Sequence, residues 1–183
     1  MQSKLQPKVE NVVASVLLGS SIPLNALVGT ENTDYDPGQL PGLIYKIDHP
    51  ESAAIIFSWG KVVSTGTKSV RDATIAIGKV IHKIKKTGIK VRGDVIIEVE
   101  EITASAKIAE KLNLEEVSFS LEGSEYNPDR LPALLYKPKG SGASLLLSSD
   151  GRMVCTGAKK MKDVRSLMNM LRKKLGEIGI MVS

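Results

Sequence analysis

The sequence predicts an α+β protein built as a tandem repeat with pseudo-twofold symmetry. One curved antiparallel sheet of about ten strands would carry helices on its convex face. Three observations predict this fold. The segment Gly60–Lys68 (GKVVSTGTK) returns 91 positions later as Gly151–Lys159 (GRMVCTGAK). Apolar, β-branched runs precede it in both halves, and each half closes on a long amphipathic helix. We therefore divide the 183 residues into a first repeat, 1–92, and a second repeat, 93–183.

Each repeat opens with a strand and a short helix. The β-branched run Val9–Val16 predicts a strand, and it returns 90 positions later as Val99–Ala106. The segment Ser21–Leu27 predicts a short helix, because a Ser N-cap and a proline near the first turn favour helix initiation. Its counterpart in the second repeat lies at about 109–117.

The middle of each repeat is a turn that leads into several strands. Tyr35–Lys46 (YDPGQLPGLIYK) is matched by Tyr126–Lys137 (YNPDRLPALLYK). The Asp-Pro or Asn-Pro pair predicts a turn, and the second proline is typical of a strand start. Further strands are predicted at 53–59, 61–67, 143–149 and 152–158.

Each repeat ends with a long helix. In the first repeat Ser69 and Asp72 have the spacing of a capping box, and Gly88 is placed to end the helix. In the second repeat Gly176 follows an apolar stripe that we expect in the core rather than in a cofactor site: Val164, Leu167, Met168, Leu171 and Leu175.

Composition is that of an ordinary globular protein. No apolar run approaches the ~20 residues of a membrane span, and the N-terminus lacks the apolar core of a signal peptide. The single cysteine, Cys155, excludes an internal disulfide and a cysteine-cluster metal site, which favours a reducing, cytoplasmic setting. The net charge is +5, and residues 1–92 carry all of it, with 12 Lys/Arg against 7 Asp/Glu. A mildly basic protein suits a polyanionic partner.

No catalytic pattern accompanies these features. The sequence has no Gly-rich phosphate loop, no Ser/His/Asp or Cys/His set, and no carboxylate cluster on the predicted apolar face. Cys155 lies on a predicted strand, where a buried small residue is expected rather than a nucleophile. We therefore expect no enzyme and no cofactor.

The predicted sheet has two faces, and its helices are too few to cover both. Val63 and Thr65 point to one side, whereas Val62 and Ser64 point to the other. One long and one short helix per repeat can cover only one side. The other side would expose Val, Thr, Ile and Leu, and exposed apolar surface of that size indicates a binding site. A homodimer that buries the surface is the alternative.

The duplicated turn-and-strand segments resemble the TATA-box-binding protein family in its archaeal form, from about Lys8 to Ile180. The resemblance implies a saddle whose concave sheet face binds the minor groove of promoter DNA. It also implies a general transcription initiation factor that bends the AT-rich TATA box and recruits transcription factor B and RNA polymerase. Small Val and Thr side chains suit the groove floor, and apolar wedges kink the duplex; this family is a standard example of that behaviour.

The resemblance assigns roles to particular residues. The predicted minor-groove residues are Asn11, Val13, Leu40, Ile55, Phe57, Val63, Thr65, Thr103, Leu131, Leu146, Val154 and Thr156. The predicted phosphate contacts are Lys46, Lys61, Lys68, Arg130, Lys137, Arg152 and Lys159. The loop predicted to meet transcription factor B holds Asn127, Asp129 and Arg130.

The second repeat departs from the family pattern. The family has Phe at four wedge positions, and here they are Leu40, Phe57, Leu131 and Ser148. Glu101 replaces the groove-reading amide that Asn11 keeps, and a carboxylate cannot donate to the groove's acceptors.

Two more changes fall in the second repeat. Thr103 replaces the Val beside that amide, and Arg130 stands where the family presents acidic residues to transcription factor B. The alternative function is therefore a diverged paralogue with weakened DNA binding, acting mainly as a regulatory or transcription-factor interaction protein.

Overall fold

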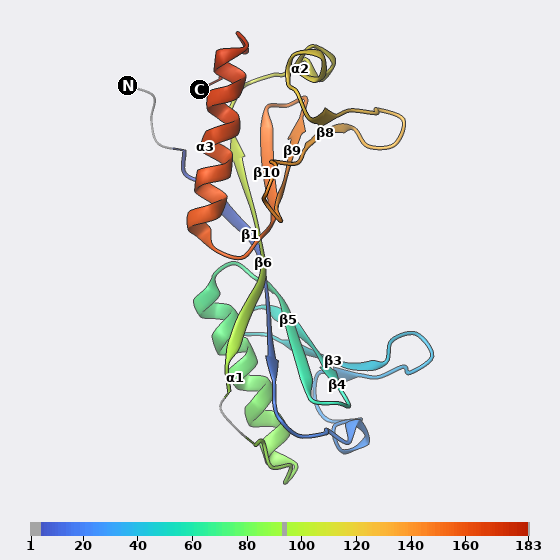
Figure 1. Cartoon of the computed structure of the whole chain (residues 1–183). Coiled ribbons are helices and arrows are strands. Elements are labelled where there is room, and N and C mark those ends of the chain that lie inside the picture. Colours follow the sequence, from blue (N-terminus) through green and yellow to red (C-terminus); the bar gives the residue numbers. More distant parts are fainter. Residues whose placement is uncertain (1–4, 93–94, 183) are drawn as a thin grey trace. The chain divides into compact units, whose positions relative to one another are not determined.

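The computed structural model describes residues 5–92 and 95–182, and the chain divides into two compact units (Figure 1). The first half comprises Asn11–Glu100. The second half comprises Glu101–Ser183 together with Met1–Glu10. Each half holds one of the two long helices and the strands that pack against it.

The first repeat contributes five strands, one 3₁₀ helix and one α-helix. In chain order these are β1 (Lys8–Leu17), η1 (Leu24–Ala26), β2 (Thr33–Asp34), β3 (Gly42–Ile47), β4 (Ser52–Phe57), β5 (Lys61–Thr67) and α1 (Val70–Lys86).

The second repeat has the same order of elements. They are β6 (Ile97–Lys107), α2 (Leu114–Ser120), β7 (Ser124–Glu125), β8 (Ala133–Tyr136), β9 (Ser144–Ser148), β10 (Arg152–Ala158) and α3 (Met161–Glu177).

The strand order is β2-β3-β4-β5-β1-β6-β10-β9-β8-β7, so the second repeat reverses the order of the first. The assigned strand pairs of each repeat are antiparallel. This order confirms the predicted α+β fold with one antiparallel sheet of ten strands.

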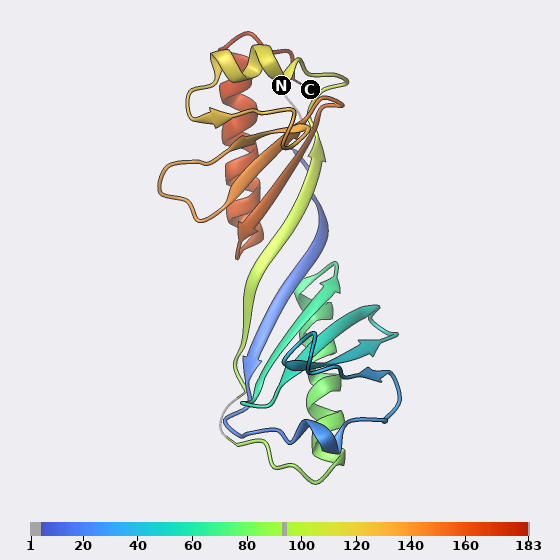
Figure 2. The same ribbon diagram turned by 90° about the vertical axis from the view of Figure 1, so that its right-hand side faces the viewer.

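The core of each half lies between its long helix and one face of its strands. In the first half Val62 and Ser64 of β5 are fully buried, and α1 packs against β5 and β4. In the second half Met153 and Cys155 of β10 are buried in the same way beneath α3. Figure 2 shows α1 and α3 each on one side of the strands of its own half. The alternation predicted for the duplicated strand is therefore confirmed.

The duplicated glycine at the start of that strand is required by a close backbone contact. Gly60 has φ +94°, and a Cβ placed on it would lie 2.3 Å from the carbonyl oxygen of Ser20. Gly151 has φ +76°, and its Cβ would lie 1.9 Å from the carbonyl oxygen of Ala109. A side chain at either position would clash with the backbone, so glycine is retained in both copies.

The predicted length of one helix is wrong. The helix expected at Ser21–Leu27 is only the three-residue η1, with Pro23 at its N-cap position and no side-chain cap bond. The last helix ends at Glu177, and Gly179 after it has the positive φ of a helix-terminating glycine. The N-cap Ser69 is confirmed, because its Oγ accepts from the Asp72 backbone N–H at 3.0 Å.

Candidate nucleic-acid interface

The face of the first half that α1 leaves open carries a row of side chains in register. Ile44 of β3 lies opposite Ile55 of β4, Ile55 opposite Val63 of β5, and Val63 opposite Ser15 of β1. The three apolar side chains remain partly accessible to solvent. We call this surface the open face of the first half, and Figure 2 shows it without a covering helix.

The second half repeats this row. Leu135 of β8 lies opposite Leu146 of β9, Leu146 opposite Val154 of β10, and Val154 opposite Ser105 of β6. The duplication therefore preserves both the positions and the apolar character of the row. The predicted floor residues Ile55, Val63, Leu146 and Val154 are brought together within their own halves.

Asn11 adds a polar group to the open face of the first half. The Gly66 backbone N–H donates to Asn11 Oδ1 at 2.7 Å, which fixes the orientation of the amide, because an NH₂ group cannot accept this bond. Asn11 Nδ2 then donates to Thr65 Oγ1 at 3.1 Å. Val13, two residues along β1, is also partly accessible.

Glu101 occupies the corresponding place in the second half. Its Oε1 accepts from Thr103 Oγ1 at 3.2 Å and also from Thr156 Oγ1. The Thr156 hydroxyl is the largest of the effects that lower the pKa of Glu101; Thr103 and the Gly157 backbone N–H contribute, while burial opposes them. The carboxylate is therefore held in its ionised, acceptor-only form.

Two further glutamates accept hydrogen bonds from serines of β1 and β6. Ser15 Oγ donates to Glu100 Oε1 at 2.6 Å in the first half, and Ser105 Oγ donates to Glu10 Oε1 at 2.6 Å in the second. Lys61 Nζ, a predicted phosphate contact, also lies 4.0 Å from Glu100 Oε1. These serine–glutamate pairs were not predicted, because no local pattern reveals side chains that pair 85 and 95 residues apart.

The end of the open face in the first half is aromatic. Phe57 stacks on Trp59, with ring centroids 5.6 Å apart and an angle of 28° between the rings. Phe57 lies opposite Gly42, where a Cβ would come within 3.2 Å of the Phe57 ring and 2.6 Å of Ile55 Cγ2. Gly42 therefore leaves space for the ring. Leu40, the other predicted wedge, lies just before β3 and is partly accessible.

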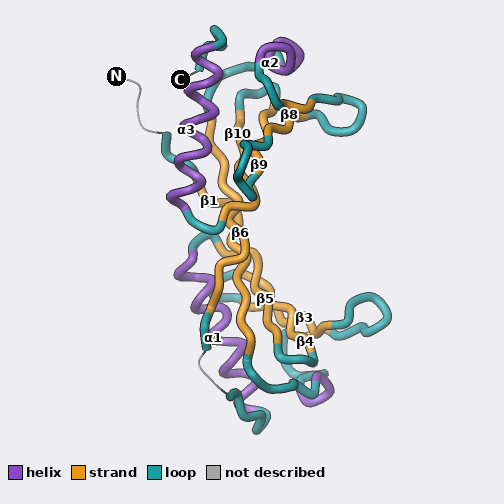
Figure 3. The backbone as a smooth tube through the Cα atoms, in the orientation of Figure 1, coloured by secondary structure: helices purple, strands orange, loops and turns teal. Residues whose placement is uncertain are grey.

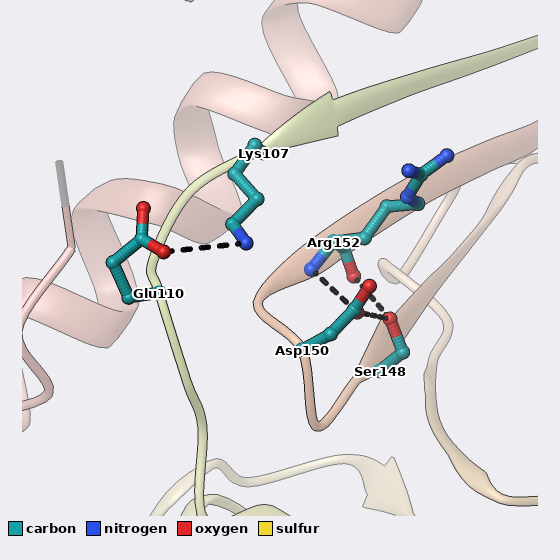
Figure 4. A network of polar contacts seen from close by, with 5 residues as sticks. All are labelled: Lys107, Glu110, Ser148, Asp150 and Arg152. Atoms are coloured by element: carbon teal, nitrogen blue, oxygen red, sulfur yellow. Dashed lines mark hydrogen bonds and ion pairs between the residues drawn. The ribbon is translucent and has the colours of Figure 1, made fainter.

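The same end of the second half is polar. Ser148 stands 91 positions after Phe57, and Asp150 stands 91 positions after Trp59. Ser148 Oγ donates to Asp150 Oδ1 and lies 3.2 Å from the Arg152 carbonyl oxygen (Figure 4). The Ser148 hydroxyl is also the main cause of the lowered pKa of Asp150. Ala133 lies opposite Ser148, at the position that Gly42 occupies in the first half.

The predicted phosphate contacts lie at the surface. Lys46 and Lys68 line one hollow beside Gly66, and Lys159 lines a hollow beside Gly157. Lys137 and Arg152 are exposed, and the Arg152 guanidinium extends away from the Ser148–Asp150 contact (Figure 4). The chemistry of these side chains fits phosphate, and their role stays a prediction.

The predicted partner-binding residues lie in the loop between β7 and β8. Figure 3 shows this loop, and the loop before β3, extending beyond the strands of their own halves. Asn127 Oδ1 accepts from the Asp129 backbone N–H at 3.1 Å, so Asn127 stabilises the turn. Asp129 and Arg130 are exposed, and Leu131 at the end of the loop is 43% exposed.

A match to a family profile identifies the family. The profile of the family "Transcription factor TFIID (or TATA-binding protein, TBP)" matches residues 6–87 and 96–178, once for each repeat. The chain belongs to this family. The resemblance read from the duplicated segments is thereby confirmed, and the family consists of DNA-binding transcription factors, not enzymes.

Proteins similar to this chain come from several archaea. The TATA-box-binding protein of Methanothermobacter thermautotrophicus is 38% identical over 94% of this chain and 96% of its own length. That of Methanosphaera stadtmanae is 40% identical over 86% of each chain. Methanococcus jannaschii TBP has a similar structure, with a TM-score of 0.84 and 34% identity over 94% of this chain and 99% of its own.

Trp59 is the residue of this surface that sequence reasoning missed. The sequence predicted a strand through Trp59, whereas β4 ends at Phe57 and Trp59 lies in the following turn, 58% exposed. A tryptophan two residues after the one predicted wedge that is aromatic was the available signal.

Among the residues that the structure describes, no helix is both long and apolar enough to cross a membrane.

Proposed function

We propose that this protein is a transcription initiation factor that binds the minor groove of AT-rich promoter DNA, the TATA box, through its open faces and bends the duplex. One observation carries the proposal. Both halves hold an in-register row of aliphatic side chains, flanked by a hydrogen-bonded polar group, on the face that the helices leave uncovered.

The chemistry of this face suits the minor groove. A·T pairs present only the acceptors N3 and O2 there, and Asn11 has an amide N–H that can donate to them. Val63 and Ile55 offer flat apolar contact with the groove floor. Phe57, supported by Trp59, is shaped to enter a base step and kink the duplex, as apolar wedges of minor-groove proteins do.

The remaining assignments concern partners. We expect promoter-bound protein to recruit transcription factor B through the loop that holds Asn127, Asp129 and Arg130, and RNA polymerase through that complex. Without DNA, a second copy is the expected cover for the open faces, which would give a homodimer. Promoter DNA as a partner places the protein in the cytoplasm with the chromosome.

A gel-shift titration tests the proposal. We expect tighter binding to an AT-rich duplex than to a scrambled duplex of equal length, and we expect end-to-end energy transfer on a labelled duplex to report a bend. If all seven predicted phosphate contacts form, the slope of log K against log salt is roughly −6, from about −0.9 per contact. Equal affinity for both duplexes would contradict the proposal.

A second candidate function is favoured by the second half. The acceptor-only Glu101 and the polar Ser148 support a paralogue whose DNA binding is weak and whose main role is to hold transcription factors. The same titration with transcription factor B separates the two. A promoter initiation factor should bind DNA alone and more tightly with the factor, whereas the paralogue should bind the factor without DNA.

A further inference from the structure

The two halves place opposite hydrogen-bonding groups at the same point of their open faces. In the first half, the Gly66 N–H donates to Asn11 Oδ1, and Asn11 Nδ2 donates to Thr65 Oγ1. Because Nδ2 carries two hydrogens, one N–H remains without a partner among the described residues. The first half therefore presents a hydrogen-bond donor.

The second half presents acceptors. The hydroxyls of Thr103 and Thr156 each hold one hydrogen, and both donate it to Glu101 Oε1. Their oxygens are then left with lone pairs only. The Glu101 carboxylate has about four acceptor positions. Three donors, the hydroxyls of Thr103 and Thr156 and the Gly157 backbone N–H, bind to it, so it can still accept a further hydrogen bond.

Two residues of the second half, Glu101 and Thr103, together replace the donor of the first half with acceptors. Thr65 and Thr156 correspond in the duplication, as do Gly66 and Gly157, so both halves supply the same supporting donors. The second half changes the reading residue to Glu101 and also changes the counterpart of Val13 to Thr103, which donates to that carboxylate. Thr103 thus acts as a positioning residue for Glu101.

We propose that Glu101 is a specificity-determining residue that selects a G·C pair beneath the second half. The guanine N2 amino group is the one donor in the minor groove, whereas an A·T pair presents only acceptors that a carboxylate repels. Asn11 selects an A·T pair beneath the first half by the opposite chemistry. The two halves of the preferred DNA site therefore differ in base composition. This inference rests on the proposed minor-groove function.

A panel of duplexes tests the inference. The parent duplex holds only A·T pairs across the site, and single G·C pairs replace them one position at a time. For each G·C duplex a matched I·C duplex is made, because inosine lacks the N2 amino group and leaves the major groove unchanged. We expect one position at which G·C binds about tenfold more tightly than I·C, since a good base contact discriminates by that order.

Two variants complete the test. Glu101→Gln keeps the length of the side chain and supplies an N–H donor, so the preference for G·C over I·C should disappear. Asn11→Asp is the matched variant of the first half, and it should create a second position of G·C preference. Thr103→Val should weaken the preference less than Glu101→Gln does.

The outcomes separate the two proposals. If the protein binds the parent duplex but binds no G·C duplex more tightly than its I·C partner, the inference about Glu101 is overturned and the minor-groove function stands. If Glu101→Gln retains the wild-type preference, the inference is likewise overturned. If no duplex binds even at low salt, the proposed function fails and the inference fails with it.

Discussion

The ends of strands β4 and β9 differ far more than the cores of the two halves. In the first half Phe57 stacks on Trp59 and lies opposite Gly42, whereas in the second half Ser148 donates to Asp150 and lies opposite Ala133. Gly42 lies opposite the large Phe57 ring, and Ala133 lies opposite the small Ser148 side chain. The smaller of the two residues therefore faces the larger partner. The comparison teaches that the duplication preserved the scaffold and allowed the binding surface to become unequal.

The largest effect is expected from removing Phe57, the aromatic residue that we propose as a wedge. Phe57→Ser gives the first half the residue that the second half holds. We expect DNA binding to weaken about a hundredfold, or about 2.8 kcal/mol, because the proposed insertion and stacking of the ring on bases would be lost. A gel shift with an AT-rich duplex measures the change.

The matched control is Ser148→Ala in the second half. It removes a hydroxyl already bound to Asp150 and should change the affinity less than twofold, a shift smaller than about 0.5 kcal/mol. Equal losses in the two variants would show that the halves contribute alike and would contradict the comparison.

A gain of function is the next largest effect. The double variant Ala133→Gly with Ser148→Phe rebuilds the first half's end in the second half. We expect about tenfold tighter binding and a larger bend, since a second aromatic wedge adds stacking of about 1.4 kcal/mol.

Ser148→Phe alone should gain less. In the first half a Cβ at Gly42 would lie within 3.2 Å of the Phe57 ring, and Ala133 carries such a Cβ. If the single and double variants bind equally well, the pairing of glycine with the ring has no energetic role.

A smaller effect concerns the cores. Ser64 and Cys155 are equivalent and fully buried, and Ser64 Oγ has no hydrogen-bond partner among the described residues. Ser64→Cys should therefore stabilise the protein by about 1 kcal/mol, because an unsatisfied buried hydroxyl is costly. Burial raises the pKa of Cys155 to about 11, so a thiol at such a site stays neutral near pH 7.

Urea unfolding at neutral pH measures this difference. The reverse variant, Cys155→Ser, should lower the free energy of unfolding by a similar amount. An unchanged midpoint for both variants would mean that the Ser64 hydroxyl finds a partner in solution.

The smallest expected effect is the pH dependence of Glu101. Its hydrogen bonds lower its pKa below the ordinary 4.5, so the ionised carboxylate stabilises the folded protein above that pH. The contribution falls as the pH drops through the lower pKa of the folded state. We expect the stability difference between wild type and Glu101→Gln to shrink between about pH 6 and about pH 3.

Unfolding titrations across this range check the sign. Thr103→Val removes one donor, so the pKa of Glu101 should rise toward its ordinary value. The contribution of the carboxylate to stability should then be smaller, and its loss should be complete at a higher pH. A stability difference that grows on acidification would contradict the assigned charge state.

Much of this fold could be predicted because the sequence contains each element twice, so that a pattern seen in one copy could be checked in the other. Two copies of one strand fixed which side chains face the helix, and Val62, Ser64, Met153 and Cys155 are indeed buried. The length of the short helix could not be predicted from Ser21 and Pro23, because Pro23 itself occupies the N-cap position and no side chain caps η1.

The candidate site was harder to predict than the fold. The resemblance supplied Asn11 and Phe57, yet no pattern indicated that Thr103 donates to Glu101 or that Ser105 pairs with Glu10. These contacts depend on how strands distant in sequence are brought together. Trp59 was missed because its position beyond β4 depends on where the turn begins.

Trp59 is the sole tryptophan of the chain, and it lies on the first half only. Its indole fluorescence therefore reports on one end of the sheet without any attached label. A duplex that reaches Phe57 should change the emission, and one confined to the second half should leave it unchanged. Because the two halves differ in this way, the emission of Trp59 should report the orientation in which the protein binds DNA.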